Sequence, residues 1–190
     1  MDFTEKTLRR INGYEGIIVR VNVDRIQLAD GREALREVVE HPGGVCVLPI
    51  DGEGRAWCVR QFRYPARRHF LEAPAGKLEP GEEPRSAALR ELREETGFIP
   101  GRLLELGEFH TSPGYNTEKL HLFLALELTR GEAQPDPGEL LELVPLPFAE
   151  LTDMVMRNEL PDAKTAMAVL KADRLLSAGL ARGERSSAPD

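Results

Sequence analysis

Residues 76–98 read GKLEPGEEPRSAALRELREETGF, and this stretch decides the fold. The segment Glu72–Glu82 overlaps its start and contains two prolines and two glycines, so we expect a loop there. Pro84 suits the first turn of a helix, because its missing N–H would have no partner at that position. Gly97 suits the left-handed residue that ends a helix. The sequence therefore predicts a loop followed by a helix over Arg85–Thr96.

The expected helix carries more glutamates on one face than a helix favours. Glu91, Glu94 and Glu95 fall within about 100° of one another on a helical wheel, and Leu89 and Leu92 lie on the opposite, core-facing side. Like charges three or four residues apart each destabilise a helix by a few tenths of a kcal/mol. Two of the three also lie near the C-terminal end, where the helix dipole disfavours anions. Local violations of this kind are expected at functional sites.

A bound cation would resolve this conflict. Three carboxylates without a nearby His or Cys form an all-oxygen site, which favours Mg²⁺, Mn²⁺ or Ca²⁺ over Zn²⁺ or copper. The residues alone leave open a second interpretation, a solvated face that is neutralised by Arg90 and Arg93.

The complete spacing of the segment favours the metal site. Gly76 is followed after five residues by Glu82, and after seven more by Arg90-Glu91-Leu92, one residue, Glu94-Glu95, one residue and Gly97-Phe98. All seven fixed letters of the pattern Gx5Ex7REUxEExGU, where U is a bulky apolar residue, are present. By this motif the sequence resembles a Nudix hydrolase. Phe98 stands where an aliphatic residue is more usual, which concerns packing rather than chemistry.

The resemblance implies an α/β fold, an α/β/α sandwich with a mixed β-sheet and a small N-terminal antiparallel β subdomain. It implies hydrolysis of a nucleoside diphosphate linked to another moiety. The implied metal ligands, for Mg²⁺ with Mn²⁺ able to substitute, are the Ala75 carbonyl and the carboxylates of Glu91, Glu94 and Glu95. Glu82 and Arg90 would pair and hold the loop against the helix.

A second motif, SPGxxxE within Thr111–Glu118, resembles the ADP-ribose pyrophosphatase subgroup, with Pro113 sixteen residues after Gly97. The resemblance makes Glu118 the candidate general base and Pro113 and Gly114 candidates for substrate binding. It implies hydrolysis of ADP-ribose to AMP and ribose 5-phosphate. Two alternatives stay open: hydrolysis of another nucleotide sugar such as GDP-mannose, and a non-catalytic module that senses ADP-ribose. Without the first motif, Glu118 would be interpreted as a solvated residue in a surface turn.

Three further segments resemble the same subgroup: residues 41–44 (HPGG), 61–64 (QFRY) and 162–165 (DAKT). In relatives Arg63 lies near the substrate phosphates, which suits a planar guanidinium, and Arg67 is a weaker candidate. Glu72 is expected to contact the nucleotide or the metal shell. A surface ion pair is the alternative for Arg63. The resemblance also implies a homodimer in which N-terminal strands swap between subunits.

Hydrophobic periodicity predicts the remaining elements. Strands are expected at 19–24, 35–40, 45–50, 57–61, 103–109, 120–128 and 143–146, the first four as an antiparallel meander, and helices at 149–157 and 163–176. In the last helix an apolar stripe is expected to form core or dimer packing: Ala163, Ala166, Met167 and Leu170. The expected domains are a β subdomain at 1–42, the hydrolase domain at 43–180 and a disordered tail at 181–190.

Composition limits the classes of function. The 190 residues carry a formal net charge of −7, so we expect no nucleic-acid partner. This charge is compatible with the small phosphorylated substrate that the resemblance implies, because a metal ion can supply the positive charge. No apolar run approaches the ~20 residues of a membrane span, and the first ten residues lack the apolar core of a secretory signal. We therefore expect no membrane partner and a cytoplasmic location.

Cys46 and Cys58 are expected to be reduced, buried thiols, with a disulfide as the alternative.

Overall fold

The computed structural model describes residues 2–132 and 140–179 and divides into two compact units. The N-terminal unit comprises Met1–Gly43 and Phe109–Lys119, and the main unit comprises Gly44–Glu108 and Leu120–Asp190. The boundary expected near residue 42 takes no account of residues 109–119, which pack with the N-terminal strands. The tail expected at 181–190 lies outside the described residues.

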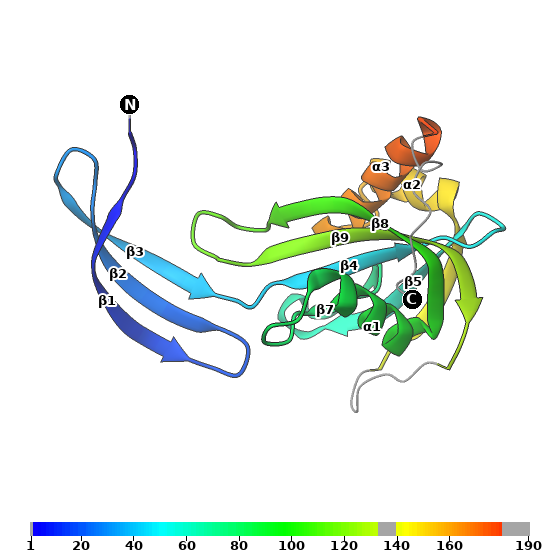
Figure 1. Cartoon of the computed structure of the whole chain (residues 1–190), viewed down its shortest axis with the longest axis horizontal. Helices are drawn as coiled ribbons and strands as arrows, with labels where there is room; N and C mark the ends of the chain where they lie inside the picture. Colours follow the sequence, from blue (N-terminus) through cyan, green and yellow to red (C-terminus); the bar gives the residue numbers. More distant parts are fainter. Residues whose placement is uncertain (1, 133–139, 180–190) are drawn as a thin grey trace, which may run out of the picture. The chain divides into compact units, whose positions relative to one another are not determined.

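The N-terminal unit contains a three-stranded antiparallel sheet, ordered β1 (Lys6–Glu15), β2 (Arg20–Gln27) and β3 (Glu33–Glu40) (Figure 1). The strand expected at 19–24 is confirmed, but its more buried face carries Asn22 and Asp24 rather than the valines. Arg10 explains this in part, because it donates two hydrogen bonds of 3.0 Å to the Asp24 carboxylate.

The main unit contains a mixed sheet ordered β7 (Ala75–Lys77), β4 (Gly44–Pro49), β9 (Lys119–Arg130) and β8 (Phe98–His110). Strand β4 pairs in parallel with β9 and antiparallel with β7. Every residue of β4 is buried, as expected for a central strand that is covered on both faces. A second sheet is antiparallel and ordered β10 (Glu142–Pro147), β5 (Arg55–Arg63) and β6 (Arg68–Glu72).

Three helices complete the described part of the main unit: α1 (Pro84–Thr96), α2 (Phe148–Met156) and α3 (Ala163–Ser177). A single-turn 3-10 helix, η1 (Tyr64–Ala66), separates β5 from β6. Both α1 and α3 contact β4, and Figure 1 draws α1 on one side of this strand and the α2–α3 pair on the other. The core between α1 and the sheet includes Val45, Val47, Leu92, Phe98 and Phe123. The arrangement confirms the α/β class with a mixed sheet.

Two expectations about the strands are wrong. The predicted loop at 72–82 contains β7, and Glu72 ends β6. The antiparallel meander is limited to β1–β3, because β4 joins β9 and β7 while β5 joins β10 and β6. Gly44 permits the close pairing of β4 with β7, since a Cβ there would lie 2.7 Å from the Gly76 carbonyl oxygen.

In two helices the face that is buried within the chain differs from the expected one. In α1, Leu92 is buried but Leu89 is 40% exposed. In α3 the apolar stripe that was expected to form core or dimer packing is half-buried or exposed, so it is not part of the core of this chain, and dimer packing stays a prediction. The buried face of α3 is a different one: Thr165, Ala168, Val169 and Ala172. Small side chains on that face let α3 lie close to β4, which a pattern based on large apolar residues does not identify.

Both cysteines are free and buried, which confirms the reduced thiols. Burial raises the pKa of Cys58 to about 12 and also raises the pKa of Cys46. Among the described helices, none combines the length and the apolarity needed to cross a membrane.

Candidate active site

The candidate site is built where β7 meets α1. Gly76 in β7 faces Glu91, and a Cβ at Gly76 would lie 1.8 Å from the Glu91 Oε1 atom. A side chain at this position would therefore displace the Glu91 carboxylate from its place beside the strand. At the other end of α1, Gly97 adopts φ 74° and donates its N–H to the Arg93 carbonyl at 2.8 Å. Gly76 thus leaves room for the Glu91 carboxylate, and Gly97 ends the helix.

Arg90 lies at the centre of the acidic cluster on α1. It donates two hydrogen bonds of 2.9 Å to the Glu82 carboxylate, and single bonds to Glu91 at 2.8 Å and Glu94 at 3.0 Å. A further bond of 3.2 Å reaches the Lys77 carbonyl. Hydrogen bonds from Arg90 lower the pKa of Glu82, and those to Glu82 raise the pKa of Arg90. The predicted Glu82–Arg90 pair is thus present, and it ties the loop to the helix.

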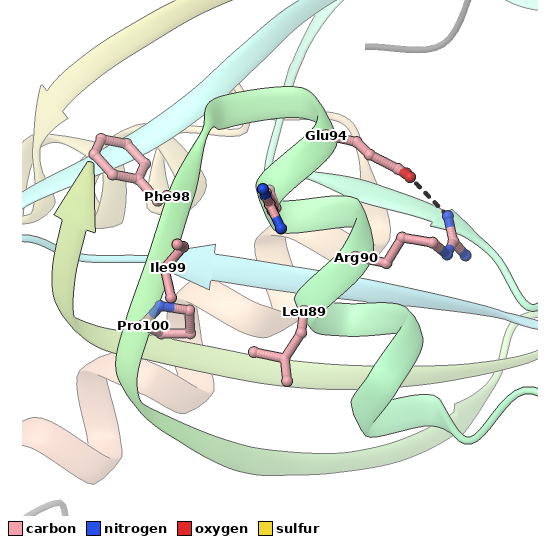
Figure 2. A pocket seen from close by; sticks show the side chains of 7 residues that line it. Leu89, Arg90, Glu94, Phe98, Ile99 and Pro100 are labelled. Atoms are coloured by element: carbon pink, nitrogen blue, oxygen red, sulfur yellow. Dashed lines mark hydrogen bonds and ion pairs between the residues drawn. The ribbon is translucent and has the colours of Figure 1, made fainter. Parts of the chain in front are cut away.

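The remaining box glutamate contacts the strand. Glu95 accepts a hydrogen bond of 3.3 Å from the Ala75 N–H, and Ala75 pairs with Cys46 of β4. Figure 2 shows Arg90 and Glu94 joined on α1, beside a pocket of about 400 Å³ that Leu89 also lines. This pocket accounts for the exposure of Leu89.

The donor set fits a hard divalent cation. Glu82, Glu91, Glu94 and Glu95 carry four negative charges against the one positive charge of Arg90, and all their ligating atoms are oxygens. Across residues 2–132 and 140–179, no three His, Cys, Asp or Glu side chains converge as a preformed ligand group. The Arg90 hydrogen bonds orient three of these four carboxylates, and the negative excess of the group supplies the attraction for a cation.

Glu118 belongs to the N-terminal unit, where the loop that carries it is fixed to the end of β3. The Val39 N–H donates to the Tyr115 carbonyl at 2.7 Å, and the Thr117 N–H donates to the Val39 carbonyl at 2.9 Å. The Glu118 carboxylate accepts a hydrogen bond of 2.8 Å from the Thr111 hydroxyl and lies 3.7 Å from His41 Nδ1. The role of Glu118 as general base stays a prediction, as do substrate contacts of the exposed residues Pro113 and Gly114.

Arg63 pairs with Glu72, a carboxylate that is only 2% exposed. Arg63 donates from Nε at 2.8 Å and from Nη2 at 2.6 Å, and Lys164 Nζ donates to the same carboxylate. Burial opposes ionisation of Glu72, but the hydrogen bonds and charges of Arg63 and Lys164 outweigh it and lower the pKa of Glu72. The ion pair proposed as the alternative for Arg63 is therefore present, but with a buried partner. Arg67 lies with its guanidinium 3.5 Å from the Tyr64 ring centroid.

The sequence did not indicate that the start of α3 belongs to this cluster. Asp162 caps α3 by accepting from the Thr165 N–H at 3.0 Å and also accepts from Lys164 Nζ at 2.9 Å. The Thr165 hydroxyl accepts from the Ala73 N–H at 2.9 Å. The sequence marks residues 162–165 only as a segment that resembles the subgroup. The burial of Glu72, which requires a second cation, becomes visible only in the structure.

Comparison with known proteins agrees with this geometry. A family model described as the NUDIX domain matches residues 40–168. The chain is 41% identical to the ADP-ribose pyrophosphatase of Bacillus subtilis, over 87% of this chain and 90% of that protein. It is 40% identical to the methanol dehydrogenase activator of Bacillus methanolicus, over 88% and 91% of the two chains. A more distant relative, the GDP-mannose pyrophosphatase of Yersinia enterocolitica, is 32% identical over 71% and 75%.

A solved structure shares the fold. The crystal structure of an ADP compounds hydrolase superposes with a TM-score of 0.84 and 22% sequence identity, covering 94% of this chain and 98% of that one. The family model matches more than half of the chain, within the part that carries the complete box and the Glu82–Arg90 pair. The chain therefore belongs to the NUDIX hydrolase family.

Proposed function

We propose that this protein hydrolyses the pyrophosphate bond of ADP-ribose with Mg²⁺, giving AMP and ribose 5-phosphate. The choice of ADP-ribose as the substrate rests on the 41% identity to the ADP-ribose pyrophosphatase of Bacillus subtilis, which extends over nearly the whole length of both chains. The carboxylates around Arg90 support the reaction class, because a diphosphate repels an attacking nucleophile unless its charge is neutralised.

Glu91, Glu94, Glu95 and the Ala75 carbonyl would hold the divalent cation, with Mn²⁺ able to replace Mg²⁺. When bound, the cation neutralises the diphosphate and lowers the pKa of a coordinated water. Glu82 and Arg90 keep the preceding loop in place against α1 through their paired hydrogen bonds. Gly76 leaves room for the Glu91 carboxylate beside β7, and the Ala75 N–H contacts Glu95 of the helix.

The remaining residues of the proposed site activate the attacking water or bind the substrate. Glu118 accepts the proton of the attacking water, in a loop that backbone hydrogen bonds hold to β3. Arg63 contacts the phosphates and Glu72 orients it, with Arg67 a weaker phosphate contact. Pro113 and Gly114 line the substrate in the same loop as Glu118.

The protein is further proposed to be a cytoplasmic homodimer that acts on a small nucleoside diphosphate sugar, without a nucleic-acid or membrane partner. An open apolar face on the N-terminal sheet supports the dimer. Ile11 pairs with Val23 and Tyr14 pairs with Val21, so these four side chains share one face, and Ile11 and Tyr14 are exposed. The expected domain division, a β subdomain followed by the hydrolase domain, belongs to the same proposal.

Two other functions are the outcomes against which this proposal is tested. Hydrolysis of GDP-mannose is supported by the name of the Yersinia enterocolitica relative. A module that binds ADP-ribose without cleaving it would have no need of the complete set of box carboxylates, and here every one is present.

Product analysis tests the proposal. The purified protein is incubated with Mg²⁺ and, separately, with ADP-ribose, GDP-mannose, UDP-glucose, FAD and diadenosine polyphosphates. We expect AMP and ribose 5-phosphate from ADP-ribose at the highest kcat/KM, and loss of this activity in Glu95→Gln and Glu118→Gln. Glu83→Gln is the matched control, because Glu83 is an exposed residue at a variable position of the box and its side chain makes no capping hydrogen bond. A preference for GDP-mannose would overturn the assignment of ADP-ribose as the substrate. Binding of ADP-ribose without cleavage would overturn the assignment of hydrolase activity.

A further inference from the structure

We infer that Lys164 is a positioning residue of the site, acting through Glu72 on Arg63. The inference rests on the proposed function, because it assigns to Arg63 the binding of the substrate's diphosphate. Lys164 lies at the start of α3, about a hundred residues further along the chain than Arg63, and neither the motif nor the family match assigns it a role.

The buried carboxylate of Glu72 requires more than one cation. A carboxylate that is almost fully removed from water is stable as an anion only when charged partners and hydrogen bonds replace its hydration. Arg63 occupies both oxygens of Glu72, and Lys164 donates to Oε2, the atom that also accepts from Arg63 Nη2. Lys164 is itself largely buried and also donates to Asp162 at 2.9 Å. The four charges therefore balance as two cations and two carboxylates.

The pairing of Arg63 leaves one side of its guanidinium open. Nε and Nη2 face Glu72, while Nη1 makes no hydrogen bond within the described part of the chain. The Arg63 side chain is 39% exposed, against 2% for Glu72. A guanidinium held along one edge and open at the other is suited to phosphate binding, because its orientation is already fixed. Lys164 donates to the same carboxylate and keeps it ionised and in place, so the acceptor that holds Arg63 is itself fixed.

The start of α3 also holds the segment that leads to Ala75. The Ala73 N–H donates to the Thr165 hydroxyl, and the Pro74 carbonyl accepts from the Val47 N–H at 2.8 Å. Glu72 and Ala73 are thus both fixed by α3, through Lys164 and Thr165. A change at Lys164 therefore reaches Arg63 directly through Glu72, while the Thr165 hydrogen bond to Ala73 stays in place.

Steady-state kinetics of the full chain with Mg²⁺ and ADP-ribose test the inference. We expect Lys164→Met to raise KM about tenfold or more while kcat changes less than about threefold, and Lys164→Arg to restore most of the affinity. Lys171→Met is the matched control, because it makes the same change at an exposed lysine of the same helix. All rates are measured well below the melting midpoint of each variant, so that loss of folded protein does not contribute.

The same substitution in a variant that lacks Arg63 tests whether Lys164 acts through that residue. In Arg63→Gln, the further change Lys164→Met is expected to raise KM no more, because the residue through which Lys164 acts is gone. An equal increase of KM in both backgrounds would overturn the inference. So would a lower melting midpoint of Lys164→Met with an unchanged KM, since that result describes a purely structural residue.

A readout without turnover separates this inference from the proposed function. The Nε–H of Arg63, which donates to Glu72, can be followed by nitrogen-15 NMR of arginine-labelled protein. We expect its exchange with water to be several times faster in Lys164→Met and unchanged in Lys171→Met. If no nucleotide sugar is cleaved, the proposed function fails while this measurement still decides whether Lys164 holds Arg63. Unchanged exchange in Lys164→Met would overturn the positioning role.

Discussion

Gly76 shows how one missing side chain sets the geometry of the site. A Cβ at this position would lie 1.8–2.4 Å from the carboxylate atoms of Glu91, far closer than any real contact. The glycine of the box therefore leaves free the space that the Glu91 carboxylate occupies beside β7.

Gly76→Ala is expected to destabilise the protein by about 1 kcal/mol, because the Glu91 carboxylate must leave its hydrogen bond with Arg90 to admit the methyl group. This displaces a metal-ligand candidate, so activity should fall as well. Chemical denaturation and kcat/KM are measured together. Gly52→Ala is the control, since a Cβ at Gly52 meets nothing within 4 Å. Equal stability of the two variants would show that the close approach has no energetic weight.

Arg90 is the residue on which the acidic cluster depends. Its guanidinium reaches Glu82 along two parallel hydrogen bonds and two further carboxylates by single bonds, which an ammonium group cannot reproduce.

We expect Arg90→Lys to lower kcat/KM by about 10- to 100-fold, the usual effect of removing a group that orients metal ligands. The concentration of Mg²⁺ needed for half-maximal activity should also change, because the carboxylates lose their fixed orientation. Arg93→Lys makes the same exchange one turn away, at an exposed arginine. The prediction is wrong if both variants respond alike to Mg²⁺.

At the scale of elements, the ends of the helices were predictable and the partners of the strands were not. Pro84 and Gly97 mark the start and end of α1 because proline and glycine act through their own backbone. The strand β7 was missed because it is three residues long and lies in a segment rich in proline and glycine. This strand forms by pairing with β4, which lies at residues 44–49, and the local sequence pattern of residues 75–77 does not indicate that pairing.

The turn between β4 and β5 provides a pH-dependent element. Burial opposes ionisation of Asp51, but hydrogen bonds from the backbone and side chain of Arg55, the Trp57 ring and the Glu53 N–H lower its pKa to about 2. Because the pKa is depressed in the folded state, this stabilisation is complete above the ordinary pKa of an aspartate. It is lost as the pH falls through about 2.

Asp51→Asn is expected to be less stable than the unchanged protein by about 1 kcal/mol at neutral pH, after screening by solvent is allowed for. The difference should shrink as the pH falls from about 4 to about 2, because the carboxylate of the unchanged protein is then protonated. Urea denaturation over that range measures it. A difference that stays constant across the range would mean that the charge of Asp51 is not its source.

At the scale of the whole molecule, the two units differ in how far the sequence predicted them. The box identified Glu82, Arg90 and the three metal-ligand candidates in advance, because those residue types at fixed spacing serve a single chemistry. The contribution of Lys164 could not be found in the same way, since a lysine at the start of a helix is ordinary until a buried Glu72 lies beside it. In the N-terminal unit, the burial of Asn22 in β2 was likewise invisible, and its amide has no hydrogen-bond partner among the described residues.

The open apolar face of the N-terminal sheet leads to a prediction about assembly. Light scattering after size exclusion should show twice the chain mass, because exposed apolar residues on one sheet face favour association. Ile11→Lys, on that face, should shift the protein toward the monomer. Asn12→Lys adds the same charge to the neighbouring residue, which pairs with Asn22 on the opposite face. Dimers that persist equally in both variants would place the contact elsewhere.

The attachment of residues 111–118 to β3 has a consequence for how new specificities could arise. The hydrogen bonds that join Val39 to Tyr115 and Thr117 use main-chain atoms only, so they do not depend on which side chains the loop carries. Substitutions at the exposed positions between Ser112 and Thr117 can therefore be sampled without losing the register that places Glu118. In laboratory evolution this loop is a natural target for randomisation, with the proposed proton acceptor held constant while the surrounding surface is altered to accept a different sugar nucleotide.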